Sequence, residues 1–236
     1  MEPTDYNRRA WDEIHRRRAD AMKGRLEIPE PVRERLPELN GKHVLHLQCA
    51  TGESTSQLSE LGALVTGIDI SAEALAVARE CAPTAAFIQA DVQQLPIQLE
   101  RGRFDLVYSG GGVLNWLHDL DAWLHGIVST LRPGGALLLY DGHPVGTCLD
   151  LTLRWREDYF DEEPQPNVGW EHFDLSGEPA QEQKVERFWR VGQIVTAVAQ
   201  SGLLLRSFEE FPEFDPWHHR DKRVPGDFIL LADKPA

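Results

Sequence analysis

The sequence lacks hydrophobic runs of membrane-spanning length and has few cysteines. No apolar stretch approaches the about 20 residues that a transmembrane helix needs, and the opening residues, MEPTDYNRRAWDE, contain no apolar signal-peptide core. The three cysteines (Cys49, Cys81 and Cys148) are far apart, and none belongs to a CxxC pair. Because disulfide frameworks and zinc sites usually need paired cysteines, this pattern predicts reduced thiols in a cytoplasmic protein without a membrane segment.

Basic residues are also scarce, since 24 Lys and Arg stand against 38 Asp and Glu and the net charge is −14. Proteins that bind nucleic acid usually present a basic surface to the phosphates, so we expect no nucleic-acid partner. The charge favours a neutral or cationic small molecule instead. The chain has 236 residues, 42% of them hydrophobic and 26% charged, which is typical of a globular protein. The sequence does not distinguish a monomer from a homodimer.

Short apolar runs alternate with helical patterns from residue 42 onward. Strands are expected at 43–49, 64–70, 85–91, 104–110, 136–142, 203–211 and 227–235. Helices are expected at 53–62, 71–82, 119–131 and 185–201, and a turn at 132–135. Near-continuous apolar strands separated by helices predict a Rossmann-like, doubly wound α/β fold, in which helices cover both faces of a mainly parallel seven-stranded sheet. No helix separates the last two strands, so we expect an antiparallel strand at the sheet edge.

Two segments depart from this alternation. Residues 5–24 predict a helix with a thin apolar stripe that includes Trp11 and Ile14, so we interpret residues 1–41 as an N-terminal helical lid or arm on a core of residues 42–236. Residues 144–185 are rich in proline, aromatic and acidic residues, and no clear periodicity runs through them. A segment this long without regular structure is often functional, so we expect it to cover an acceptor site.

In an open parallel sheet, ligands bind beyond the carboxyl ends of the strands, which directs attention to the residues that end them. Asp69 and Asp91 end the second and third strands, where carboxylates can accept ribose hydroxyls and an adenine amino group. The first turn lacks the G-x-G-x-x-G of dinucleotide-binding loops, because Gln48, Ala50 and Glu53 occupy the glycine positions. Glu53 at a helix start repels phosphate. The sequence therefore favours a nucleoside ligand that is cationic and carries no phosphate.

At these residues the chain resembles the class I S-adenosylmethionine-dependent methyltransferases, over about residues 43–142. The segments that carry the resemblance are VLHLQCATGEST, VTGIDIS, FIQADVQQLP, FDLVYSGGGVLNWL and LRPGGALLLYDGHP. Most members have D-x-G-x-G at positions 46–50, where this chain has His46, Gln48 and Ala50. The resemblance implies that S-adenosylmethionine is the cofactor and that Asp69 holds its ribose. It also implies further cofactor contacts at Gln48, Ala50, Thr51, Gly52, Ile70, Asp91, Val92, Ser109 and Gly110.

The function that follows is methyl transfer to a small molecule, through oxygen or nitrogen, with a secondary metabolite as one candidate. We expect Tyr6 and Trp11 on the N-terminal helix to close over the cofactor. His143, at the rim after the fifth strand, is the candidate general base or acceptor-orienting donor, and a histidine that caps the turn is the alternative. Two other functions remain open: a protein of this fold that binds S-adenosylmethionine without methyl transfer, and a nucleotide-dependent oxidoreductase.

Several other residues are interpreted as structural. His46, in a central strand, is expected to be a hydrogen-bonded core histidine. Trp116, Trp170 and Trp189 are expected to pack in the core rather than against a substrate. His218 and His219, with Asp215 and Asp221 nearby, are interpreted as solvated surface, and we expect no metal site.

Overall fold

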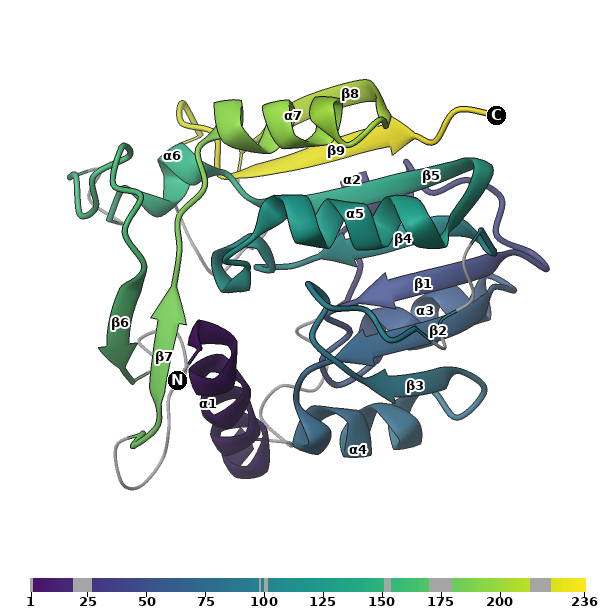
Figure 1. The fold of residues 1–236 in the computed structure, drawn as a ribbon, viewed down its shortest axis with the longest axis horizontal. Coiled ribbons are helices and arrows are strands. Elements are labelled where there is room, and N and C mark those ends of the chain that lie inside the picture. The colour runs from purple at the N-terminus through teal and green to yellow at the C-terminus, as the bar shows by residue number, and fades with distance from the viewer. Residues whose placement is uncertain are drawn as a thin grey trace.

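The structure is a computed structural model that describes residues 2–18, 27–97, 99, 102–150, 154–169, 180–212 and 222–236. Its centre is a seven-stranded sheet in the order β3-β2-β1-β4-β5-β9-β8 (Figure 1). The strands are β1 (His43–Leu47), β2 (Leu64–Asp69), β3 (Ala86–Gln89), β4 (Phe104–Gly110), β5 (Leu131–Gly142), β8 (Leu204–Phe211) and β9 (Asp227–Asp233). β9 runs antiparallel to both of its neighbours, β5 and β8. The predicted Rossmann-like sheet with one antiparallel strand is confirmed.

Helices cover both faces of this sheet. On one face, α5 (Leu120–Thr130) and α7 (Val191–Gln200) pack Trp123 and Val198 into the larger hydrophobic cluster (Figure 1). On the other face, α2 (Glu30–Arg33) and α3 (Glu53–Glu60) contribute Val32 and Leu58 to a second cluster. Because α2 belongs to this second cluster, the part of the N-terminal segment that lies outside the core is α1.

Local sequence explains where two of the helices begin. α4 (Ala72–Cys81) starts after Ser71, whose hydroxyl accepts a hydrogen bond from the N–H of Ala74 at 3.1 Å. α5 starts after Asp119, whose carboxylate accepts from the N–H of Ala122 at 2.9 Å. Each side chain satisfies a backbone donor that the first helical turn leaves unpaired.

The carboxyl ends of the parallel strands all point toward one edge of the molecule, on the left in Figure 1. Four further elements lie at this edge: α1 (Pro3–Arg18), α6 (Pro144–Thr147), and a separate two-stranded sheet of β6 (Gln165–Val168) and β7 (Gln183–Glu186). A 3₁₀ turn, η1 (Leu114–Trp116), follows β4. The helix α1 and the described elements of the 144–185 insertion therefore lie at the edge where a ligand is expected.

Two expected boundaries were wrong. The helix expected from residue 185 begins at Val191, because residues 183–186 pair with β6 as the strand β7. The strand expected from residue 136 begins at Leu131 as β5. Residues 132–135, where a turn is expected, have no partner in its register, since Phe104 pairs with Leu131 and Leu106 with Ala136. No helix within the described ranges combines the length and apolar character needed to cross a membrane.

Candidate functional site

Three loops meet at the carboxyl ends of the central strands. The N–H of Ala50, after β1, donates a hydrogen bond of 2.8 Å to Oδ2 of Asp69 at the end of β2. The hydroxyl of Ser109, at the end of β4, donates to Oε1 of Gln48 at 3.2 Å. The structure thus brings together four of the residues that the sequence assigns to a cofactor site.

Asp69 is the buried carboxylate of this group, with 8% of its surface exposed. Besides the bond to Ala50, Oδ1 accepts a hydrogen bond of 2.9 Å from the N–H of Ser71. Burial is the largest influence on its pKa, which is raised to about 6 although these N–H donors favour the charged form. The N–H of Ile70 also favours the charged form. Each carboxylate oxygen has two lone-pair positions, so these three backbone donors leave room for a hydroxyl donor.

The turn after β1 keeps a glycine-like backbone without glycine. Gln48 and Ala50 have φ values of 53° and 45°, a left-handed conformation that is costly for residues with a Cβ. The Gln48 amide offsets part of this cost, because its Nε2 donates to the carbonyl of Val113 at 2.9 Å while its Oε1 accepts from Ser109. Gln48 therefore connects the β1 turn to the loop after β4.

The N-terminal end of α3 is filled by the chain's own backbone and side chains. Gly52 has a φ of 87°, and a Cβ there would lie 2.9 Å from Cα of Ala78 in α4, so only glycine fits this close helix contact. Thr51 donates its hydroxyl hydrogen bond to Glu53 Oε2 at 2.7 Å. A carboxylate held at the first turn of α3 disfavours a phosphate in the same place.

Asp141 organises the loop that follows β4. Its Oδ1 accepts hydrogen bonds from the N–H groups of Gly112 and Gly142, and its Oδ2 accepts from those of Val113 and Leu114, all between 2.7 and 3.0 Å. Sequence reasoning missed this role. The available signal was an acidic residue at the end of a strand beside the triplet Gly110–Gly112, whose N–H groups need acceptors.

The remaining expected cofactor residues lie beside these loops. Asp91 follows β3, and its Oδ1 accepts from the N–H of Gln93 at 2.9 Å. Val92 is buried in the larger hydrophobic cluster, and the carbonyl of Ile70 accepts from the side chain of Gln89. At Gly110 a Cβ would lie 2.1 Å from the ring of Tyr140, so the β4 end must be glycine. Direct contact of any of these residues with the cofactor stays a prediction.

Hydrogen bonds hold the helix α1 against β7 and against the start of α4. Asn7 pairs with both backbone groups of Val185 in β7, since its Oδ1 accepts from the N–H at 2.7 Å and its Nδ2 donates to the carbonyl at 2.8 Å. Asp12 accepts from the hydroxyl of Ser71 at 2.7 Å, beside the first turn of α4. Sequence reasoning missed both residues, because their partners are distant in the chain and no local pattern marks them.

Two aromatic residues join α1 to the loop after β4. The rings of Trp11 and Trp116 meet edge to face at 5.0 Å, and Nε1 of Trp116 donates to the carbonyl of Gly112 at 2.8 Å. Tyr6 lies under the guanidinium of Arg9, 5.5 Å from its ring centroid. Trp189, packed against the larger cluster, donates to the carbonyl of Leu117. Trp170 lies outside the described residues.

His143 caps α6 at the end of β5. Its Nδ1 accepts from the N–H of Val145 at 3.2 Å, and its Nε2 lies 2.9 Å from Oε1 of Glu210 on β8. Burial lowers the pKa of His143, while Glu210 acts in the opposite direction. The cap agrees with the alternative interpretation from the sequence, and the catalytic role stays a prediction.

His46 is buried as a neutral core histidine, as expected from the sequence. Its Nδ1 lies 2.8 Å from the hydroxyl of Thr55 in α3, and burial lowers its pKa to about 3. The unfolded chain can protonate this imidazole near its ordinary pKa of 6.5, whereas the folded protein cannot until far lower pH. The stability that His46 contributes is therefore lost as the pH falls below 6.5.

We expect this linkage to appear in unfolding experiments. Between about pH 7.5 and about pH 5.5 the free energy of unfolding of the wild type should fall by about 1.4 kcal/mol more than that of the variant His46→Asn. Urea titrations of both proteins at the two pH values measure the difference. Parallel pH dependence of the two proteins contradicts the assignment.

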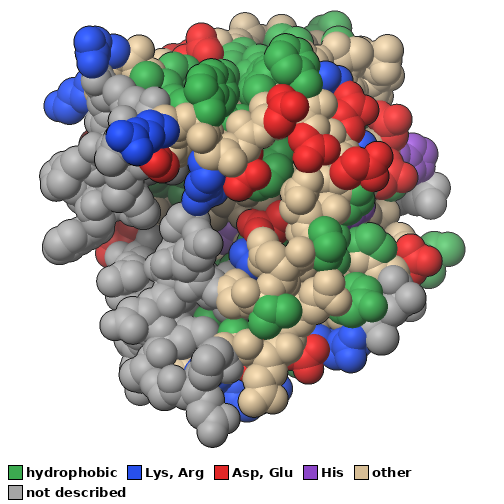
Figure 2. Space-filling model, turned by 90° about the vertical axis from the view of Figure 1, so that its left-hand side faces the viewer, with side chains coloured by type: hydrophobic (Ala, Val, Ile, Leu, Met, Phe, Trp, Pro, Cys, Tyr) green, Lys and Arg blue, Asp and Glu red, His purple; other side chains and the backbone are tan. Residues whose placement is uncertain are grey.

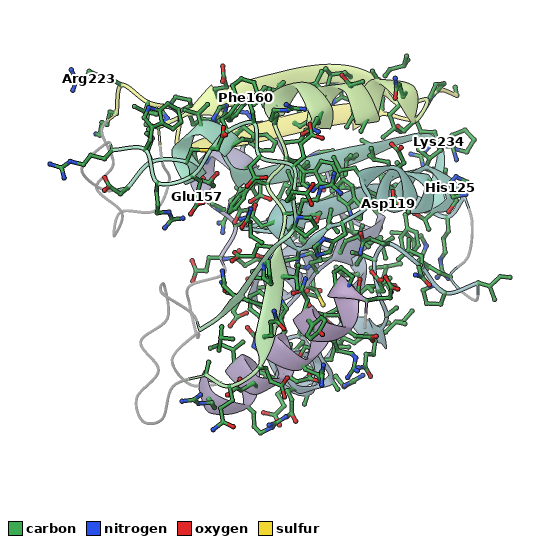
Figure 3. All side chains as sticks on the ribbon, turned by 60° about the vertical axis from the view of Figure 1, so that its left-hand side comes forward. Asp119, His125, Glu157, Phe160, Arg223 and Lys234 are labelled. Carbon is green, nitrogen blue, oxygen red and sulfur yellow. The ribbon has the colours of Figure 1, made fainter. Side chains whose placement is uncertain are left out.

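Within the described part of the chain, no group of three or more His, Cys, Asp or Glu side chains is arranged to hold a metal ion. His218, His219, Asp215 and Asp221 lie outside the described residues. A groove of about 690 Å³ lies elsewhere, between α5, α7 and residues 159–160, and Asp119 and Phe160 at its border are labelled in Figure 3. This groove shares none of the strand-end residues of the candidate site.

Comparisons with known proteins agree with this geometry. A family model of the methyltransferase domain matches residues 45–139. The chain is 32% identical over 156 residues to malonyl-[acyl-carrier protein] O-methyltransferase of Enterobacter lignolyticus, covering 66% of this chain and 56% of that protein. It is 41% identical over 105 residues to trans-aconitate 2-methyltransferase of Deinococcus radiodurans, covering 43% and 38%. An S-adenosylmethionine-dependent methyltransferase structure from Mesorhizobium loti superimposes with a TM-score of 0.70 at 26% identity, covering 86% and 96%.

The sheet order and the strand-end loops define a Rossmann-like α/β protein of the doubly wound class. Residues 45–139 match a methyltransferase domain and the Mesorhizobium loti structure superimposes on most of the chain, so the chain contains a domain of the class I S-adenosylmethionine-dependent methyltransferase type, for which S-adenosylmethionine is the cofactor. The chain spans about half the length of the curated relatives it matches.

The donor set of the site fits that cofactor. Asp69 is a buried carboxylate that forms no ion pair with another described residue, and it retains acceptor capacity for a hydroxyl. Glu53 at the start of α3 favours a ligand with positive charge over one with phosphates. The residues present therefore suit a nucleoside that carries a cationic tail.

Proposed function

We propose that this chain transfers a methyl group from S-adenosylmethionine to an oxygen or nitrogen atom of a small molecule. The observation that carries the proposal is the arrangement of Asp69, whose buried carboxylate is oriented by backbone N–H groups, including those of Ala50 and Ser71, and still has room for a ribose hydroxyl. When bound, the cofactor supplies a methyl group that is activated by the neighbouring positive sulfur.

The chain's own residues then position and shield the reactants. Asp69 would hold the ribose, and Asp91 with Val92 would lie along the adenine. Gln48, whose amide bridges Ser109 and Val113, fixes the turn that would face the methionine part. Because the alignment of nucleophile and methyl group supplies much of the acceleration in such a displacement, these fixed loops are the expected source of catalysis.

We place the acceptor beneath α1 and the described elements of the 144–185 insertion, which would cover the strand ends of the core. The bonds of Asn7 to Val185 and of Asp12 to Ser71 support this placement, because they hold α1 over the strand ends. The names of the two curated relatives, which refer to malonyl-[acyl-carrier protein] and trans-aconitate, support a small acceptor group. Acidic side chains gather at the upper right of this face in Figure 2, which supports an acceptor other than nucleic acid.

Two measurements test the proposal. Calorimetry with S-adenosylmethionine and S-adenosylhomocysteine should show binding of both. Incubation with cofactor labelled in its methyl group and a panel of small carboxylic acids, phenols and amines should then yield a labelled acceptor. A protein that binds neither form overturns the proposal. Binding of the cofactor with conversion of an acceptor but no label in the product would instead identify a non-methylating relative.

The role of His143 has its own test, in the variant His143→Asn. Asparagine can still accept the hydrogen bond from Val145 N–H that caps α6, so the fold is retained while the imidazole is lost. If His143 is the general base, kcat should fall by about 100-fold with little change in the KM for the cofactor. A kcat within about threefold of the wild type leaves His143 with its capping role alone.

A further inference from the structure

His15, on α1, has a buried nitrogen without a partner. The side chain is 2% exposed, and Nδ1 has no hydrogen-bond partner among the described residues. Its ring stacks on Trp11, with centroids 5.4 Å apart. Burial lowers its pKa to about 4, so the imidazole is neutral and carries one N–H. Buried polar atoms usually have a partner, so this orphan leaves a hydrogen-bonding position open to a ligand.

The attachments of α1 show which way His15 faces. At 3.6 residues per turn, the order around the helix is Asn7, Trp11, His15 and Asp12. Asn7 is bonded to β7 on one side, and Asp12 is bonded to Ser71 of the α4 start on the other. Trp11 and His15 therefore face the space between β7 and α4, where the strands β4, β1 and β2 end.

Three rings form a row across those strand ends. Trp116 is bonded to the loop after β4, Trp11 contacts Trp116, and His15 follows Trp11. The row extends toward the end of β2, because Asp12 on the same helix accepts a hydrogen bond from Ser71, two residues after Asp69. Asp12, three residues before His15 on α1, is thereby held beside the residues that follow Asp69. His15 thus lies on the side of the site where Asp69 ends β2.

We propose that Nδ1 of His15 donates a hydrogen bond to a ribose hydroxyl of the cofactor that Asp69 holds. The chemistry of the two groups is complementary, because a hydroxyl that donates its proton to the Asp69 carboxylate still has lone pairs that accept from an N–H. His15 would act as a second ribose ligand, provided by α1, so that cofactor binding and closure of α1 depend on each other. The inference rests on the proposed function, since it requires that the cofactor is bound.

The variant His15→Phe tests the proposal through two measurements, thermal stability without ligand and affinity for S-adenosylhomocysteine. The proposal predicts that the first is kept or raised while the second falls. Phenylalanine keeps the stack on Trp11 and removes the unpaired nitrogen, so the ligand-free variant should unfold at the same or a higher temperature than the wild type. Its affinity for S-adenosylhomocysteine should fall about tenfold. His15→Gln, which keeps an N–H donor, should recover part of the affinity. An affinity of His15→Phe within twofold of the wild type overturns the proposal.

A ligand series locates the contact. Calorimetry with S-adenosylhomocysteine and its 2′-deoxy and 3′-deoxy analogues should show that one missing hydroxyl costs the wild type more affinity than it costs His15→Phe. Equal losses in both proteins mean that His15 does not touch the ribose, which also overturns the proposal. Failure of the proposed function is distinct, because the wild type itself would then bind none of the three ligands.

Discussion

Replacing Asp69 with asparagine should lower the affinity for S-adenosylhomocysteine by about 10- to 100-fold, because a hydrogen bond to a charged acceptor contributes roughly 1.5–3 kcal/mol and Asp69 is the expected acceptor for the ribose. The amide also turns a donor toward the N–H of Ala50 or of Ser71, both of which now donate to the carboxylate. Calorimetry on the purified variant measures the loss, and circular dichroism verifies that it is folded.

Asp105→Asn is the matched control. Asp105 also accepts from a backbone N–H, that of His43 at 2.9 Å, and it lies at the start of β4, at the opposite edge of the sheet. Its ion pair with Arg132 makes some loss of stability expected, without loss of cofactor affinity. If Asp69→Asn binds within about threefold of the wild type, or if both variants lose affinity equally, Asp69 is not the ribose ligand.

The pH dependence of binding provides a second readout on Asp69. Burial raises its pKa in the free protein to about 6, and the ribose hydroxyl needs the charged form as acceptor. Protonation therefore competes with binding as the pH falls through 6. Between about pH 7 and about pH 5 the wild-type affinity should drop about tenfold, whereas the residual affinity of Asp69→Asn should change far less.

The main sheet could be predicted because its strands and helices carry strong local patterns. The five parallel strands lie in near-continuous apolar runs, and Ser71 and Asp119 mark helix starts by their capping chemistry. The two-stranded sheet could not be predicted in this way. β6 and β7 are four-residue segments, QPNV and QKVE, with no strong alternation, and β7 is held by Asn7, 178 positions earlier than Val185 in the chain. Tertiary contact, rather than propensity, defines it.

The candidate site likewise contains some residues that the sequence could identify and others that it could not. Asp69, Asp91 and Ser109 could be selected because a parallel sheet brings all its strand ends to one edge. The loop bonds of Asp141, and the inward-facing His15, depend on how segments far apart in the chain pack together. The left-handed backbone at Gln48 and Ala50 was also hidden, since these residue types normally avoid it.

Replacing Asp141 with asparagine should destabilise the protein by about 3 kcal/mol or more. The carboxylate accepts four backbone hydrogen bonds while only 5% exposed, and an amide offers one acceptor oxygen and directs its NH₂ at groups that are themselves donors. Buried donors left unpaired cost roughly 1–3 kcal/mol each, part of which local rearrangement recovers. Urea unfolding near neutral pH measures the change.

The loss should extend to cofactor binding, because the loop that Asp141 orders carries the carbonyl of Val113, which fixes Gln48, and that of Gly112, which fixes Trp116. At a temperature where Asp141→Asn is still folded, its affinity for S-adenosylhomocysteine should fall by about tenfold. Asp119→Asn serves as the control, since its exposed carboxylate caps α5 and asparagine caps a helix equally well. An Asp141→Asn protein as stable as this control would show that the four backbone hydrogen bonds contribute little to stability. The inference that Asp141 supports the turn at Gln48 through Val113 would then be wrong.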